Sequence, residues 1–285
     1  MANSIKIIAL DLDGTLLDTQ KRLSDRNRAA LESAAQQGAF VVPTTGRFFG
    51  MIPPAVRDLP FVRYAITVNG AQVYDRVTDA AIAKEEIPAE TAVGIMSILD
   101  RHDVIYDCYR LNWGWVTAAH QEKSADYATD DHYLKLVREF RRPVPDLKAH
   151  LRETAAQGDV QKVMLFARKT DAAAAKADLA EIVREVSAAY PEIKITSSTW
   201  NDLEFNAPTA HKGRALECLA RHLGLTLADC AAFGDGMNDL TMVAAAGLGV
   251  AMANAVPEVK AAAKVLARTN DDDGVGRVLE ALALG

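Results

Sequence analysis

The chain has 285 residues, a hydrophobic content of 49%, a charged content of 25% and a formal net charge of −6 at pH 7. This composition is typical of a globular protein with a substantial core, and the length fits one large domain or two smaller ones. The acidic balance and the lack of a basic run in the sequence argue against binding to nucleic acid. We therefore expect no nucleic-acid partner.

The cysteines and the N-terminal residues bear on where the protein works. Cys108, Cys218 and Cys230 are scattered and form no CxxC pair, which favours a reducing compartment and no structural zinc. The first apolar run, at 5–10, is too short to span a bilayer. We expect a cytoplasmic protein without a membrane partner, either a monomer or a small homo-oligomer.

Short apolar runs alternate with longer amphipathic stretches, a pattern that predicts an α/β fold with a mostly parallel sheet. The first strand is expected at 5–10, and a helix follows over 24–38 with Ser24 or Asp25 as N-cap. The further strands are expected at 39–44, 64–68, 228–234, 248–252 and 263–269. The further helices are expected at 239–247, 255–264 and 274–284.

The middle of the chain, from about Pro88 to Thr199, has a different pattern of helices and strands, and all three tryptophans fall between residues 113 and 200. This shift predicts a second α+β domain that is inserted into the first. The expected boundaries are 1–87 and 201–285 for the first domain and 88–200 for the inserted one.

Polar residues follow the predicted strands at the points where ligands bind in an open parallel sheet, beyond the carboxyl ends. The segments that follow the first five core strands are DLDGT, TGR, NGA, GDGMND and ANA, which include Asp11, Thr45, Asn69, Asp235 and Asn254. Any one of these segments fits a turn, whereas all five together predict a site at one edge of the sheet.

The residue types at this edge point to phosphate chemistry. The converging carboxylates are Asp11, Asp13, Asp235 and Asp239. Such a group favours a divalent cation with oxygen ligands, Mg²⁺ in particular. A cation together with Thr45, the backbone at Gly14 and Lys212 would bind a phosphoryl group. Lys212 begins a predicted helix, whose dipole also favours an anion.

DLDGTLL, TGR, HKG and GDGMND, in this order, resemble the four signature motifs of the haloacid dehalogenase superfamily. ITVNGA, LEFNAP, GVAMANAVPEVKAAAK and TNDDDGV resemble segments of its Cof-type phosphatases (subclass IIB). The resemblance covers 5–75 and 203–278. It implies a Rossmann-like parallel-sheet core with an inserted α/β cap domain, and a Mg²⁺-dependent phosphomonoester hydrolase acting on small phosphorylated metabolites, sugar phosphates first.

The resemblance also implies roles for individual residues. Asp11 would attack phosphorus to form an aspartyl-phosphate, and Asp13 would act as general acid and then general base. Thr45 and Lys212 would hold the transferring phosphoryl group. The metal would be held by Asp11, the Asp13 carbonyl and Asp235, with Asn238 and Asp239 in support. The expected phosphate- and substrate-binding residues are Gly14, Gly46, Arg47, Asn69 and Asn238.

Several readings of these residues stay open at this point. Arg47 fits either a phosphate contact or a structural ion pair, and His211 fits either a substrate contact or a solvent-facing position. In the inserted domain, the candidates for reading the leaving group are Asp107, Tyr109, Arg110 and Trp115.

Two rival functions also remain. A phosphotransferase or phosphomutase of the same superfamily would carry every motif, and a regulatory or binding protein could keep the fold without turnover. Release of inorganic phosphate would separate the hydrolase from both.

Overall fold

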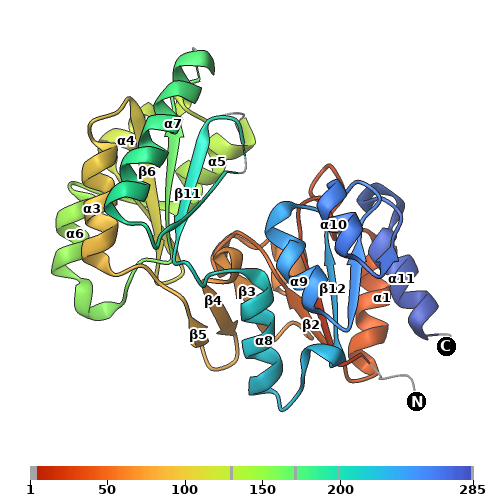
Figure 1. Ribbon diagram of the computed structural model, residues 1–285. Coiled ribbons are helices and arrows are strands. Elements are labelled where there is room, and N and C mark those ends of the chain that lie inside the picture. The colour runs from red at the N-terminus through yellow and green to blue at the C-terminus, as the bar shows by residue number, and fades with distance from the viewer. Residues whose placement is uncertain (1–4, 129–130, 170–171, 198, 284–285) are drawn as a thin grey trace. The chain divides into compact units, whose positions relative to one another are not determined.

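The computed structural model describes residues 5–128, 131–169, 172–197 and 199–283. The chain divides into two compact units (Figure 1). The first comprises Met1–Lys84 and Ala210–Gly285, and the second comprises Glu85–Thr209. The second unit is therefore an insertion in the sequence of the first.

The first unit is built on a parallel sheet with the strand order β14-β13-β12-β1-β2. Its strands are β1 (Ile7–Leu10), β2 (Phe40–Pro43), β12 (Cys230–Gly234), β13 (Leu248–Ala251) and β14 (Val265–Leu266). All four residues of β1 are buried, as expected for a strand that has neighbours on both sides and helices on both faces. The chain continues from β1 to β2 on one side, while β12 lies on the other, so the strand order reverses at β1.

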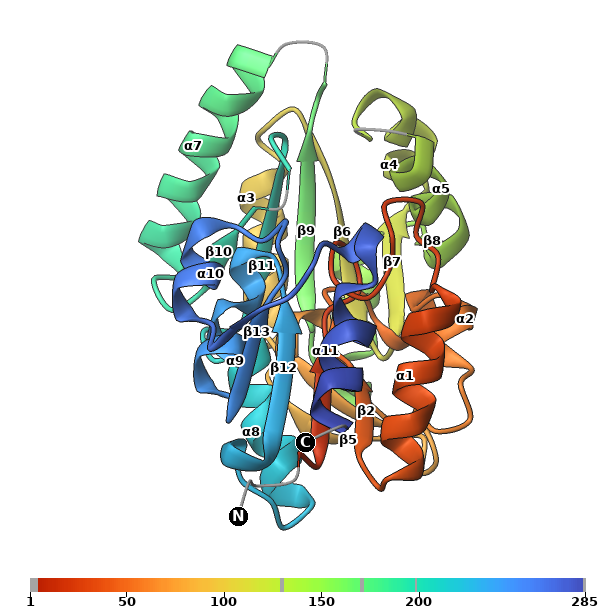
Figure 2. The ribbon, with the colours of Figure 1, turned by 90° about the vertical axis from the view of Figure 1, so that its right-hand side faces the viewer.

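Helices cover both faces of this sheet (Figures 1 and 2). They are α1 (Asp25–Gln36), α2 (Pro54–Arg57), α8 (Lys212–His222), α9 (Leu240–Ala245), α10 (Pro257–Ala262) and α11 (Gly274–Ala283), with the short 3₁₀ turns η1 (Phe49–Met51), η2 (Val68–Gly70), η5 (Leu227–Asp229), η6 (Met237–Asp239) and η7 (Asn270–Asp272). The predicted helices correspond to α1, α9, α10 and α11, and the expected end at Leu284 lies outside the described residues. Ser24 caps α1, as predicted, by accepting a hydrogen bond from the Asn27 amide.

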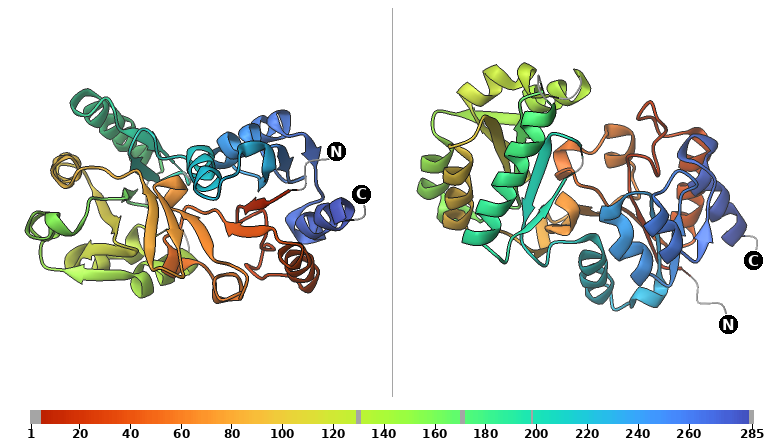
Figure 3. Two further views of the ribbon diagram at one scale, coloured as in Figure 1. Left: turned by 90° about the horizontal axis from the view of Figure 1, so that it is seen from below. Right: turned by 45° about the horizontal axis from the view of Figure 1, so that its top comes forward.

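The strand predicted at 64–68 does not join the parallel sheet, so this part of the prediction was wrong. β3 (Tyr64–Thr67) pairs antiparallel with β4 (Gln72–Asp75), which pairs with β5 (Ala80–Lys84); these strands are orange in Figure 3. The connection from β3 to β4 reverses the chain within a few residues. It is too short for a crossover between parallel strands, so β4 pairs antiparallel with β3. A single parallel bridge between Thr44 and Ile66 still holds β3 beside the end of β2.

The second unit contains a mixed sheet with the order β10-β11-β9-β6-β7-β8. Its strands are β6 (Val104–Arg110), β7 (Trp113–Thr117), β8 (Arg141–Val144), β9 (Lys162–Ala167), β10 (Lys194–Thr196) and β11 (Asp202–Asn206). Its helices are α3 (Ala89–Leu99), α4 (Ala118–Lys123), α5 (Asp131–Phe140), α6 (Leu147–Glu153) and α7 (Ala172–Ala189), with η3 (Ser124–Asp126) and η4 (Ala155–Gln157). α3 packs against α6 and α7. Among the described residues, no helix is long and apolar enough to cross a membrane.

The ends of the second unit differ from the predicted boundaries at 88 and 200. Ile87 forms an antiparallel bridge with Val160, which ties it to the second unit. β11 pairs with both β9 and β10, so the chain returns to the first unit only at Ala210. The sequence motifs do not predict this boundary. LEFNAP is adjacent along the chain to the lysine motif of the first unit, but its strand β11 pairs with strands of the second unit.

Candidate active site

The carboxyl end of β1 carries Asp11, whose amide donates to the Phe233 carbonyl at 3.0 Å. The chain then turns at Gly14, which has a φ of +87°. A Cβ atom at Gly14 would overlap with the Asp235 carboxylate, so glycine satisfies both the left-handed backbone and the close approach. The turn brings the segment after β1 against the segment after β12.

Three carboxylates meet at this edge of the sheet. Oxygens of Asp11, Asp235 and Asp239 lie within 4.8 Å of one another. The Lys212 ammonium is fully buried and lies 2.6 Å from both Asp11 Oδ1 and Asp239 Oδ1. One ammonium thus faces three carboxylates, which leaves the cluster with an excess of negative charge.

The start of α8 places Lys212 in this cluster. Gly213 allows the close approach of α8 to the chain at Thr241, because a Cβ would lie 2.6 Å from the Thr241 carbonyl oxygen. The Gly213 amide donates to Thr241 Oγ1 at 3.1 Å. His211 is the N-cap of α8, and its Nδ1 accepts from the Arg214 amide at 3.1 Å. His211 therefore has a local structural role as a helix cap.

The loop after β12 is built around Asp239. Its Oδ2 accepts from the amides of Asp235 and Gly236 at 3.0 and 2.9 Å, while its Oδ1 contacts Lys212. Asp235 Oδ1 accepts from the Thr15 hydroxyl at 2.7 Å. Asp239 is therefore shared between the cluster and the loop backbone, whereas the Asp235 carboxylate is bonded to Thr15 on the β1 side.

Burial and mutual repulsion shift the pKa values in the cluster. Burial, followed by the charges of Asp239 and Asp235, raises the pKa of Asp11 well above its ordinary value, against the opposing effect of Lys212. Burial and the Asp239 charge also raise the pKa of Asp235. For Lys212, burial acts to lower the pKa, but Asp11 and Asp239 outweigh it and raise the pKa. Additional positive charge would stabilise the ionised carboxylates.

The carboxyl of Asp13 takes no part in this cluster. Arg47 Nη2 lies 2.9 and 2.8 Å from its two oxygens, and Arg47 Nε lies 3.1 Å from Oδ2. Lys21 Nζ lies 2.8 Å from Oδ1. Partial burial acts to raise the pKa of Asp13, but Arg47 and Lys21 outweigh it and lower the pKa. Of the two readings of Arg47, the structure shows the ion pair.

Thr45 and the two asparagines are joined by a chain of hydrogen bonds. The Thr45 hydroxyl accepts from the Arg47 amide at 3.2 Å, and the Thr45 carbonyl accepts from the Asn69 amide at 3.0 Å. Asn69 Oδ1 accepts from Asn238 Nδ2 at 3.2 Å. A Cβ at Gly46 would lie 2.9 Å from Asn69 Oδ1. These residues therefore gather at the same edge, although β3 belongs to another sheet.

The backbone around Asn69 is strained. Val68, Asn69 and Gly70 all have positive φ, at 51°, 57° and 96°. This conformation is unfavourable for a β-branched residue such as valine. The Val68 amide is held by the Arg47 carbonyl at 3.0 Å. Strain of this kind persists where surrounding contacts fix the backbone, and it concentrates at functional sites.

Sequence reasoning placed Asn254 at the predicted edge without giving it a role, and it did not select Thr15 or Lys21. Thr15 lies within DLDGT, so its position alone could have found it. Asn254 Nδ2 donates to the Gly14 carbonyl at 2.7 Å, and its Oδ1 accepts from the Asn270 amide. Lys21 follows the motif at a distance, and its positive φ of 63° is not visible in the sequence.

All four leaving-group candidates of the second unit have contacts with other residues of that unit. Arg110 is fully buried, and its guanidinium donates to the Gly158 carbonyl and to Thr154. Trp115 donates to the Arg110 carbonyl at 3.3 Å and packs on His150. Asp107 and Tyr109 instead belong to a buried network with Arg141, described below.

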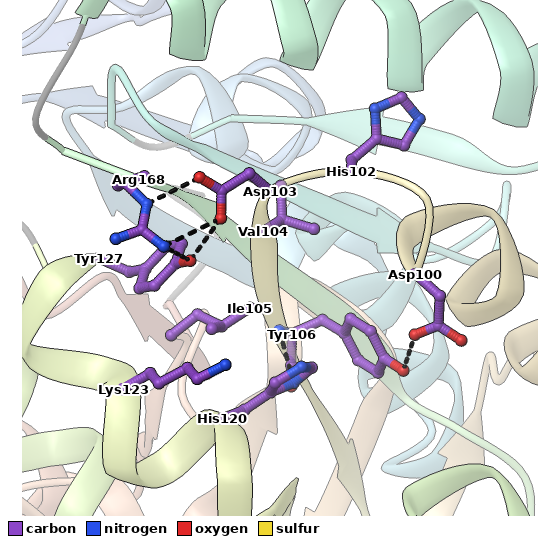
Figure 4. A pocket seen from close by; sticks show the side chains of 10 residues that line it. All are labelled: Asp100, His102, Asp103, Val104, Ile105, Tyr106, His120, Lys123, Tyr127 and Arg168. Carbon is purple, nitrogen blue, oxygen red and sulfur yellow. Dashed lines mark hydrogen bonds and ion pairs between the residues drawn. The ribbon is translucent and has the colours of Figure 1, made fainter.

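The second unit also contains a polar cavity of about 230 Å³ (Figure 4). Its lining includes His120, Lys123 and Arg168, and Arg168 donates to Asp103 at 2.7 Å. Neither the four leaving-group candidates nor any residue of the carboxylate cluster lines it.

A parallel sheet with this carboxylate edge and an inserted second unit defines a class of hydrolytic enzymes, and comparison with known proteins identifies the family. The profile of the haloacid dehalogenase-like hydrolases matches residues 8–279. The chain belongs to this family and is a phosphatase of its superfamily.

Two similar relatives and one solved structure illustrate the relationship. The 5-amino-6-(5-phospho-D-ribitylamino)uracil phosphatase YcsE of Bacillus subtilis is 28% identical, over 96% of this chain and 94% of its own length. The pyridoxal phosphate phosphatase YbhA of Escherichia coli is 28% identical over 96% and 97%. A haloacid dehalogenase-like hydrolase from Bacteroides thetaiotaomicron has a TM-score of 0.81 and 26% identity, covering 98% of this chain and all of that one.

Proposed function

We propose that this protein is a Mg²⁺-dependent phosphomonoester hydrolase that works through an aspartyl-phosphate on Asp11. The observation that carries the proposal is the cluster of Asp11, Asp235 and Asp239 around Lys212 at the carboxyl end of β1. This arrangement offers a carboxylate nucleophile, a fixed cation and oxygen ligands for a metal at one point.

The donor set fits Mg²⁺. Carboxylate oxygens are the ligands this ion prefers. Burial and the neighbouring carboxylates raise the pKa values of Asp11 and Asp235, and a bound cation would favour their ionised forms. Asp11 and Asp235 would hold the ion, with the Asp13 carbonyl as a further ligand and with Asn238 and Asp239 in support. When bound, the ion would offset carboxylate repulsion and stabilise charge on the phosphoryl oxygens.

The residues of the chain then have distinct tasks. Asp11 attacks phosphorus, so that an O–P bond forms as the bond to the leaving oxygen breaks, and Asp13 gives that oxygen a proton. Water then attacks the phosphorus of the aspartyl-phosphate, losing its proton to Asp13, and inorganic phosphate leaves with Asp11 regenerated. Lys212 and Thr45 hold the phosphoryl oxygens, and the lysine charge favours the transition state.

The charge pattern separates the two carboxyl groups at the end of β1. Asp11 lies with Lys212 and two other carboxylates, whereas Asp13 lies with Arg47 and Lys21.

Positioning and charge stabilisation must supply most of the rate enhancement, because a single general acid contributes only about 10²–10⁴-fold.

The proposed substrates are small phosphorylated metabolites, with sugar phosphates first. The two relatives are named a 5-amino-6-(5-phospho-D-ribitylamino)uracil phosphatase and a pyridoxal phosphate phosphatase. These names support small organic phosphates as the substrate class. We further propose that the inserted second unit acts as a cap that excludes water and contacts the leaving group.

Release of inorganic phosphate from a panel of phosphorylated metabolites, with and without Mg²⁺, tests the proposal. We expect Mg²⁺-dependent release from several sugar phosphates and none after chelation. An isomerised sugar phosphate in place of inorganic phosphate would identify a phosphomutase. A panel without any release would overturn the hydrolase proposal and favour a binding protein.

A further inference from the structure

Lys21 lies in a tight turn that follows the first motif. The Asp18 amide donates to the Arg22 carbonyl at 3.0 Å, and the Lys21 amide donates to the Asp18 carbonyl at 2.9 Å. The Asp18 side chain closes the turn by accepting from the amides of Gln20 and Arg22. Lys21 has a φ of 63° in this turn, a conformation that costs free energy for a residue other than glycine.

The turn directs the Lys21 ammonium to Asp13. Lys21 Nζ is 2.8 Å from Asp13 Oδ1, which also accepts from Arg47 Nη2. Arg47 is mostly buried, with 14% of its side chain exposed, whereas the Lys21 side chain is 41% exposed. An exposed ion pair alone contributes little to stability, so the strained turn is not explained by the free energy of this pair.

Two charge environments act on the Asp13 carboxyl. It follows Asp11 by two residues and lies on the same segment as the acidic cluster. Any cation held by that cluster would attract a further carboxylate. Arg47 contacts both oxygens, and Lys21 adds a second cation at Oδ1, so together they fix the carboxyl apart from the cluster.

We infer that Lys21 is a positioning residue for the acid–base step, which, together with Arg47, fixes the Asp13 carboxyl apart from the acidic cluster. This inference rests on the proposed function, since it requires Asp13 to act on the leaving group. Lys21 touches no reacting atom in this role; it acts through Asp13.

Substitution of Lys21 by glycine is the sharpest test, because glycine accepts a positive φ and keeps the turn while the ammonium is lost. The readout is turnover of two esters: an alkyl phosphate such as a sugar phosphate, and p-nitrophenyl phosphate. The alkyl leaving group needs a proton from the enzyme, whereas the nitrophenolate leaves with little help. A misplaced acid should therefore slow only the first reaction.

We expect K21G to lower kcat on the alkyl phosphate roughly tenfold, a part of what a whole general acid contributes, and to change p-nitrophenyl phosphate turnover less than twofold. Added propylammonium should restore part of the lost rate, and K21R should retain most of it. R22Q is the matched control, because it removes a cation from the same turn that pairs with Asp18 and not with Asp13. It should change neither reaction.

The other outcomes overturn the inference. Equal losses on both esters would show a general structural or charge effect, and unchanged turnover on both would show that Lys21 is dispensable. A raised KM confined to substrates with an anionic leaving group would make Lys21 a substrate contact instead. The D13N variant distinguishes failure of this inference from failure of the proposed function. If Asp13 is the general acid, D13N should slow turnover of the alkyl ester by about 10²–10⁴-fold, whether or not Lys21 positions the Asp13 carboxyl.

Discussion

Both units of the molecule bury charged side chains, the first at the carboxyl end of its parallel sheet and the second on its mixed sheet, but the charges are equal in number only in the second. In the first unit, a single ammonium faces three carboxylates: Lys212, Asp11, Asp235 and Asp239. In the second unit, two cations face two carboxylates: Arg141, Lys162, Asp107 and Glu204.

The second group is also closed by an aromatic ring. Arg141 donates to Asp107 at 2.7 Å, and Lys162 lies 2.9 Å from Glu204. Both cations lie on the ring of Tyr109, at 4.5 and 4.6 Å from its centroid. Matched charges of this kind offset one another, whereas the unmatched group in the first unit fits the cation proposed above. The difference indicates which buried charges serve chemistry and which serve the fold.

The largest expected effect follows from removing the nucleophile. D11N should reduce phosphate release by on the order of 10⁴-fold or more, because the amide cannot form the aspartyl-phosphate. Unfolding should remain cooperative, because removing one of the three repelling carboxylates does not strain the cluster. D25N, at the exposed start of α1, is the control and should keep full activity. Appreciable turnover by D11N would exclude Asp11 as nucleophile.

Breaking the balanced group should affect stability. K162M leaves Glu204 buried without its lysine, so the free energy of unfolding should fall by about 3–5 kcal/mol, as measured by urea denaturation. The double variant K162M/E204M should recover most of this loss, because it removes both charges. A double variant no more stable than K162M would show that the pair is not a balanced unit.

Gly14 tests the packing that joins the segments after β1 and β12. G14A should lower the free energy of unfolding by about 1–3 kcal/mol, because alanine is strained at this φ and its Cβ would displace the Asp235 carboxylate. G38A is the matched control: its φ is +90°, but no atom lies within 4 Å of the added Cβ. Only G14A should also lose phosphatase activity; equal activity in both variants would contradict the described approach to Asp235.

The smallest effect is a pH dependence. Burial acts to lower the pKa of Lys162, but Glu204 and Tyr109 outweigh it and raise the pKa above the ordinary value of 10.5. A raised lysine pKa adds stability that is present in full below the unfolded-state value and is lost as the pH rises through the folded-state value. The stability difference between wild type and K162M should therefore be constant from about pH 7 to 10 and shrink above that. A stability difference that shrinks as the pH falls from about 10 to 7 would mean that folding lowers the pKa of Lys162 instead of raising it.

Much of this architecture could be predicted from the sequence, because the parallel strands are continuous apolar runs and the polar segments follow them directly. Asp11 and Asp235 were placed together by this logic although they are far apart in the chain, whereas Lys212 was selected as the cation of a phosphoryl site at the start of a predicted helix. The position of β3 could not be predicted, since an apolar run does not reveal its partner. Lys21 was missed because its contact depends on a left-handed turn, and the boundary at Ala210 was missed because it depends on strand pairing.

We propose that the unmatched carboxylates of the first unit hold a divalent cation. Thermal and urea unfolding of the wild type and D235N across a Mg²⁺ titration test it most directly, with D103N in the second unit as control. We expect Mg²⁺ to stabilise wild type and D103N by about 2.7 kcal/mol at a hundredfold excess over Kd, and to have little effect on D235N. Stability that does not respond to Mg²⁺, or an equal response in D235N, would contradict it.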